Sequence, residues 1–122
     1  MSHAKTPDLK PLLGQLLPEV VAGFGFWGWS DADVLFGDLD RALAPLRRRE
    51  RDAAAPPPCD VVSGYRNYLV SGPFALVRNA AALNLLFAQS PDWVRMLRSR
   101  RYMVFDEWWG AHMLGEKRSV VS

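Results

Sequence analysis

An aromatic, apolar run that stops at two aspartates places the strongest constraint on how this chain can fold. Residues 24–29 consist of phenylalanine, tryptophan and glycine, and Asp31 and Asp33 follow almost at once. Aromatic residues favour strands, and a strand with no polar alternation is typically buried. In α/β proteins the chemistry gathers where such strands end. The run therefore predicts a buried strand with a candidate site at its end.

The composition is that of one folded domain. The chain has 122 residues, of which 49% are hydrophobic and 23% charged, so it lies far from the disordered regime. This length leaves little room for a second domain, and we expect a single domain over residues 1–122. The net charge is only +2, and no recognition motif accompanies the clustered arginines. We therefore expect no nucleic-acid partner.

The cysteine content and the hydropathy pattern indicate a cytoplasmic protein. A single cysteine, Cys59, excludes an internal disulfide and is typical of a reducing compartment. The N-terminus has no apolar signal region, and no later run approaches the length of a membrane-spanning helix. We expect a cytoplasmic chain without a transmembrane segment.

Apolar periodicity predicts an α/β fold. Leucines and valines recur at helical spacing from Leu9 to Val21, with Asp8 as the N-cap, while Gly14 and Pro18 predict that this helix is kinked or split. Further helices are predicted over 39–51, 80–89, 93–99 and 108–114, and strands over 24–29, 60–64, 68–70, 74–78 and 102–105. Residues 53–58, rich in alanine and proline, predict a surface loop. This order indicates a mixed sheet flanked by helices.

The two aspartates have the chemistry of a metal site. They are two residues apart, so in an extended chain both side chains leave the same face. Paired carboxylates suit Mg²⁺ or Mn²⁺, which are often bound together with substrate phosphates and can neutralise charge on a diphosphate leaving group. The alternative is structural: Asp31 caps a turn and Asp33 pairs with an arginine.

Several motifs, in matching order, resemble those of a glycosyltransferase-like family with a GT-A type fold, designated DUF6625. The family has Asp-Phe-Lys-Pro before Phe-Trp-Gly-x-x-Asp-x-Asp-x-x-x-Gly-Asp-Leu, and later Gly-x-Phe-x-Leu-x-Arg-Asn. The similar segments here are Asp8-Leu9-Lys10-Pro11 with Gly14, residues 26–39, residues 60–63, residues 72–79 and Phe105-Asp106-Glu107-Trp108. Together they span nearly the whole chain.

The resemblance implies transfer of a sugar from a nucleotide-sugar donor to a glycan acceptor. Asp31 and Asp33 would hold Mn²⁺ or Mg²⁺ on the donor diphosphate. Ser71 and Gly72 would form the turn that approaches the donor sugar or the acceptor, although a plain hairpin turn is equally compatible with them. Arg78 would contact a phosphate, or else it pairs with an acidic neighbour while Asn79 caps the next helix.

Three later residues complete the candidate site. Asp106 or Glu107 would act as the general base on an acceptor hydroxyl. Alternatively, the two residues are the N-cap and a first-turn acid of the final helix. His112 would be a metal ligand, as a late histidine is in some GT-A enzymes, or simply a packed or surface residue.

The resemblance covers only the C-terminal portion of a GT-A domain. Family members carry an N-terminal βαβ portion that holds the nucleotide, and nothing before Asp8 resembles it. We therefore expect a partial domain with an uncovered sheet edge and uncovered apolar helix faces, which favours self-association or a partner chain. This departure also favours an alternative hypothesis, in which the chain is a non-catalytic remnant or an interaction module that keeps the second half of the fold.

Overall fold

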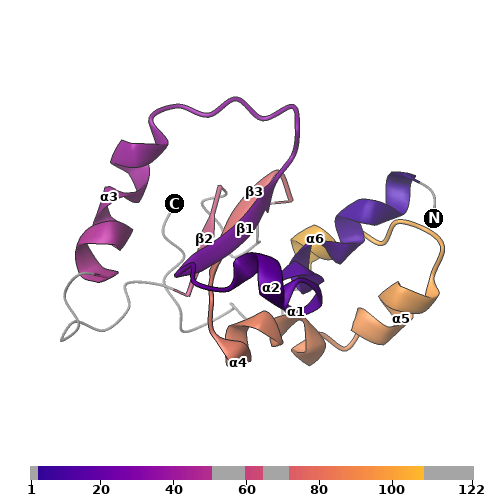
Figure 1. Cartoon of the computed structure of the whole chain (residues 1–122). Helices are drawn as coiled ribbons and strands as arrows, with labels where there is room; N and C mark the ends of the chain where they lie inside the picture. Colours follow the sequence, from indigo (N-terminus) through magenta and orange to yellow (C-terminus); the bar gives the residue numbers. More distant parts are fainter. Residues whose placement is uncertain (1–2, 51–59, 65–71, 109–122) are drawn as a thin grey trace.

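The structure, a computed structural model of the chain, describes residues 3–50, 60–64 and 72–108 (Figure 1). Several sequence predictions fall outside these residues. They are the 53–58 loop, the 68–70 strand, Ser71, His112 and the helix beyond Trp108.

Three strands form an antiparallel sheet in the part of the chain that the structure describes. They are β1 (Phe26–Ser30), β2 (Val61–Ser63) and β3 (Phe74–Arg78), in the order β1-β3-β2. Trp27 pairs with Val77 and Trp29 with Ala75. Both tryptophans are buried while Gly28 and Ser30 are exposed, so β1 buries one face, as is usual in antiparallel sheets. The predicted class, a sheet flanked by helices, is confirmed, and both described strand pairings are antiparallel.

The predicted N-terminal helix is split into three pieces. These are the 3₁₀ helix η1 (His3–Leu12), α1 (Leu13–Leu16) and α2 (Pro18–Val21). Pro7 and Pro11 lie within η1, and Pro18 begins α2. A proline lacks the N–H that a continuous helix would use, so the predicted split is confirmed. Asp8 was predicted as an N-cap, and this is wrong because it lies inside η1.

Five helical segments follow the first strand within the described residues. They are α3 (Leu39–Glu50), α4 (Ala81–Asn84), the 3₁₀ helix η2 (Leu86–Gln89), α5 (Trp93–Arg98) and α6 (Phe105–Trp108). Asp38 caps α3, because its Oδ1 accepts the Arg41 N–H at 3.0 Å. Asn79 does not cap α4. Its Nδ2 donates to the carbonyls of Val21 and Phe24, both at 2.9 Å.

The predicted strand over 102–105 is absent from the described residues. Residues 102–104 are irregular, Val104 has a φ of 57°, and Phe105 begins α6. The N–H groups of Met103 and Phe105, which a neighbouring strand would have used, donate instead to the Asp8 carboxylate. A buried side chain thus replaces the strand partner that the pattern predicted.

The core lies on the covered face of the sheet. Figure 1 shows the N-terminal helices, α4, α5 and α6 gathered on one side, and α3 at the end of a long connection from β1. The buried core residues come from both strands and helices: Leu12, Trp27, Trp29, Val61, Ala75, Val77, Leu83, Leu86, Phe87, Met96 and Phe105. Among the described residues, no helix is sufficiently long and apolar to span a membrane.

Candidate functional site

The Lys10 ammonium lies at the centre of a cluster that joins four separate segments. Its Nζ donates to Oδ1 of Asp31 at 2.6 Å, to the Gly72 carbonyl at 2.9 Å and to Oδ2 of Asp106 at 3.3 Å. An ammonium has three N–H donors, and here each has an acceptor. The motifs around residues 10, 31, 72 and 106 therefore meet at one point, as a shared site requires. We call these four residues the Lys10 cluster.

The acidic pair lies in a turn at the end of β1. The Asp31 N–H donates to the Pro73 carbonyl at 2.8 Å, and the Val34 N–H donates to the Asp31 carbonyl at 3.3 Å. The predicted extended conformation, which would place both carboxylates on one face, is therefore wrong. Asp31 begins a turn, as the structural alternative held. Its carboxylate, for which that alternative named no partner, pairs with Lys10.

The two aspartates differ in exposure and in their contacts. The Asp31 side chain is 39% exposed, and Asp33 is exposed. Within the described ranges, no ion pair of Asp33 with an arginine is found. Asp33 and the second oxygen of Asp31 are therefore the acidic groups of this site that solvent and ions reach most easily.

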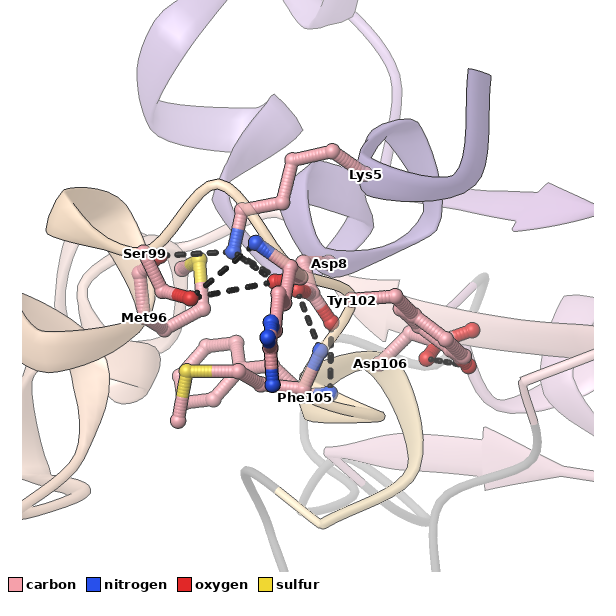
Figure 2. Close-up of polar contacts among 9 residues, drawn as sticks. Lys5, Asp8, Met96, Ser99, Tyr102, Phe105 and Asp106 are labelled. Carbon is pink, nitrogen blue, oxygen red and sulfur yellow. Dashed lines mark hydrogen bonds and ion pairs between the residues drawn. The ribbon is translucent and has the colours of Figure 1, made fainter. Parts of the chain in front are cut away.

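Asp106 is buried within the cluster. Its side chain is 3% exposed, and Oδ2 accepts from Lys10. Oδ1 accepts the Tyr102 hydroxyl at 2.8 Å (Figure 2). With both oxygens engaged, this carboxylate is arranged to hold Lys10. Glu107 follows within α6, and its side chain lies outside the described part of the structure.

The predicted donor-binding residues are divided between two places. Gly72 is buried, and its carbonyl belongs to the cluster. Arg78 lies at the far end of β3, four residues beyond Phe74 and hence about 13 Å along the strand. Its guanidinium donates to Oδ1 of Asp60 from Nε at 3.1 Å and from Nη2 at 2.8 Å. The structure thus gives Arg78 the acidic neighbour that the alternative expected.

Lys5 and Lys10 were given no role from the sequence, and Asp8 was expected only to cap a helix. Asp8 is completely buried and accepts three hydrogen bonds, from Lys5 Nζ and from the N–H groups of Met103 and Phe105, each at 2.8 Å (Figure 2). One signal could have indicated the buried pair. Lys5 and Asp8 are three residues apart, and opposite charges at that spacing can meet on one helical face.

The charge of the site favours a cation. Lys10 carries one positive charge and pairs with Asp31 and Asp106, and Asp33 follows two residues after Asp31, so these four side chains have a formal charge of −2. Among the described residues, no group of three or more histidine, cysteine, aspartate or glutamate side chains is arranged as a metal site. Two accessible carboxylates do fit Mg²⁺ or Mn²⁺ when waters and a phosphate complete the coordination. A metal at Asp31 and Asp33 would therefore need further ligands beyond these two carboxylates.

The comparisons with known proteins identify a family and no function. Neither the curated proteins nor the solved structures give a significant match to this chain. One family model matches residues 2–121 and is described as a family of unknown function. Because that match covers nearly all 122 residues, the chain belongs to this family, DUF6625, as its sequence motifs predicted.

Proposed function

We propose that this chain is a glycosyltransferase-like domain that binds a nucleotide-sugar donor through a divalent cation at Asp31 and Asp33. The observation that supports this proposal is the Lys10 cluster. Four motifs of the resemblance, separated by up to 96 residues, converge on one ammonium beside an exposed acidic pair. Such a convergence of polar groups in a partly buried place is typical of a functional site.

The charge balance makes donor binding dependent on metal. A diphosphate would be repelled by the formal charge of −2, and all three N–H donors of Lys10 are already engaged. A divalent cation on Asp33 and the free oxygen of Asp31 would remove this repulsion. Bound there, Mn²⁺ or Mg²⁺ would supply Lewis-acid stabilisation of the departing diphosphate.

The residues of the cluster divide the remaining tasks. Lys10 orients Asp31 from one side and leaves its opposite oxygen for the metal. Asp106 anchors Lys10, and both of its oxygens are engaged. We therefore assign the role of general base, which the resemblance gave to Asp106 or Glu107, to Glu107 first. The acceptor under this proposal is the hydroxyl group of a glycan.

Calorimetric titration tests the proposal. UDP-sugars and GDP-sugars are titrated into the full chain with and without Mn²⁺, and the titrations are repeated with Asp31→Asn and Asp33→Asn. We expect the wild-type chain to bind the nucleotide sugar only when Mn²⁺ is present, and we expect both variants to lose this binding. Asp40→Asn is the matched control, because Asp40 is an exposed aspartate that pairs only peripherally with Arg47. Binding that is independent of Mn²⁺, or unchanged in Asp33→Asn, would contradict the proposal.

A second function, that of a non-catalytic interaction module, is favoured by the exposed apolar side chains. Leu35 is 98% exposed, and other large apolar residues of the N-terminal half are also exposed: Leu16, Leu17, Val20, Phe24 and Phe36. Apolar surface of this kind is characteristic of a contact with a partner chain or a second copy. Concentration-dependent association in sedimentation experiments, with no binding of any nucleotide sugar, would favour this module over the enzyme.

A further inference from the structure

The buried Asp8 carboxylate accepts hydrogen bonds from the backbone on both sides of a strained residue. Its Oδ2 accepts the Met103 N–H and its Oδ1 the Phe105 N–H, both at 2.8 Å (Figure 2). Val104 lies between these two donors and has a φ of 57°. This left-handed conformation is unfavourable for a β-branched residue and persists only where its surroundings impose it. The two hydrogen bonds to Asp8 fix the backbone on either side of Val104 and so hold it in this conformation.

The strained residue, Val104, lies two residues before Asp106 of the Lys10 cluster. Phe105 begins α6, and Asp106 is its second residue. The direction in which the chain leaves Val104 therefore determines where the Asp106 carboxylate lies. On the other side, Lys10 is only two residues beyond Asp8 in η1, so one short segment holds both the backbone at 103–105 and the side chain of Asp106.

Lys5 closes the arrangement around Asp8. Its Nζ donates to Asp8 at 2.8 Å, to the Met96 carbonyl at 2.6 Å and to the Arg101 carbonyl at 3.0 Å. Every N–H of this ammonium thus has an acceptor. The charge of the buried Asp8 carboxylate is neutralised within the fold, and both of its oxygens accept hydrogen bonds there, which gives Asp8 a supporting role.

We propose that Asp8 is a positioning residue for the candidate site. It holds Val104 in the left-handed conformation, and this brings Asp106 to Lys10 and so orients Asp31. The link to metal binding rests on the proposed function, whereas the link to Lys10 does not. Within this chain of contacts Lys10 is the group hydrogen-bonded to the proposed metal ligand Asp31, and loss of such a partner typically changes metal affinity by about 10–100-fold.

The test combines Asp8→Asn with two substitutions of Val104. Asparagine keeps the shape of Asp8 but presents an N–H₂ group to one of the two backbone donors. Glycine adopts a positive φ without cost, whereas alanine keeps the Cβ that opposes it. If Asp8 acts through Val104, Asp8→Asn/Val104→Gly recovers the site and Asp8→Asn/Val104→Ala does not. The alanine variant is thus the matched control for loss of side-chain volume.

Two readouts follow the site in the full chain. One is the ¹H–¹⁵N NMR signal of the Lys10 ammonium, which its three hydrogen bonds should protect from exchange with water and which Lys10→Arg assigns by its loss. The other is the affinity for Mn²⁺ alone by calorimetry. In Asp8→Asn we expect loss of the Lys10 signal and at least about tenfold weaker Mn²⁺ binding. Val104→Gly in the Asp8→Asn background should restore the signal and most of the affinity.

Each outcome decides the inference. A Lys10 signal that is unchanged in Asp8→Asn, or rescue by alanine as complete as rescue by glycine, would overturn it. If Asp8→Asn fails to fold, rescue of folding by glycine and not by alanine supports the inference, and absence of that rescue overturns it. If the wild-type chain does not bind Mn²⁺, the proposed metal site fails while the Lys10 signal still decides the role of Asp8.

Discussion

The indole ring of Trp27 packs directly against Gly14, so that a Cβ on Gly14 would lie 2.3 Å from Cε2 of the ring. Trp27 is a buried residue of β1, and Gly14 lies in α1. This contact therefore seats the N-terminal helices on the sheet. We expect Gly14→Ala to lower the free energy of unfolding by about 1–3 kcal/mol, as overpacking of a core does. Urea denaturation measures this change.

The sign of that effect is informative because alanine ordinarily favours a helix over glycine by about 0.5–1 kcal/mol. Gly37→Ala is the control, since apart from Gly37 and its two chain neighbours nothing lies within 4 Å of the Cβ it would add. We expect this variant to be as stable as the wild type or slightly more so. A Gly14→Ala chain as stable as Gly37→Ala would contradict the packing of Trp27 on α1.

A polar network that links β1 to α4 gives the second prediction. Trp27 Nε1 donates to Oδ1 of Asn84 at 2.7 Å, and Asn84 Nδ2 donates to Oδ1 of Asn79 at 2.9 Å. Asn84→Ala would leave the buried indole N–H without its acceptor. We expect a loss of about 1–3 kcal/mol in the free energy of unfolding. Gln15→Ala, on an exposed residue of α1, should leave the unfolding midpoint unchanged.

The sequence predicted the strands well where the signal was local. Apolar and aromatic residues at 24–29, 60–64 and 74–78 correspond to β1, β2 and β3, which differ from these ranges by no more than two residues at either end. The 102–105 pattern looked equally strand-like. It failed because the Met103 and Phe105 N–H groups donate to Asp8, about 95 residues earlier in the chain. Local propensity cannot reveal a buried carboxylate that competes for backbone donors.

The sequence predicted most residues of the candidate site but not Lys10, the residue that joins them. The motifs around Asp31, Gly72 and Asp106 were singled out, and these three residues do meet. Lys10 was visible only as part of a motif. Its role depends on contacts across 21, 62 and 96 residues, which no spacing rule anticipates. Arg78 shows the opposite case, because a residue close to Gly72 in sequence is carried away from it along the length of β3.

The exposure of Leu35 gives a third prediction. This side chain lies in the connection between β1 and α3 and is almost wholly solvated. We expect Leu35→Ser to change the free energy of unfolding by no more than about 0.5 kcal/mol. Leu83→Ser, at a buried position of α4, should cost several times more. Sedimentation of the same Leu35→Ser chain shows whether the residue belongs to a contact surface, since weaker self-association with unchanged stability is then expected.

The Lys10 cluster gives the last prediction. Lys10→Met keeps the length of the side chain but leaves the Asp106 carboxylate, 3% exposed, facing Asp31 without a cation. Breaking a buried pair from one side costs about 3–5 kcal/mol, and we expect the low end because Asp31 is partly solvated. Removing the second charge should relieve this penalty. The double variant Lys10→Met/Asp106→Asn is therefore expected to be more stable than Lys10→Met alone.

A double-mutant cycle in urea measures that coupling, which for contacting residues is about 0.5–3 kcal/mol. Arg47→Met is the control, since the Arg47–Asp40 pair is largely solvated and its removal should leave the midpoint unchanged. Strictly additive effects of Lys10→Met and Asp106→Asn would mean that the ammonium is not coupled to the Asp106 carboxylate. In that case Asp106 would lie free of Lys10, and its carboxylate would return as the first candidate for the acceptor hydroxyl.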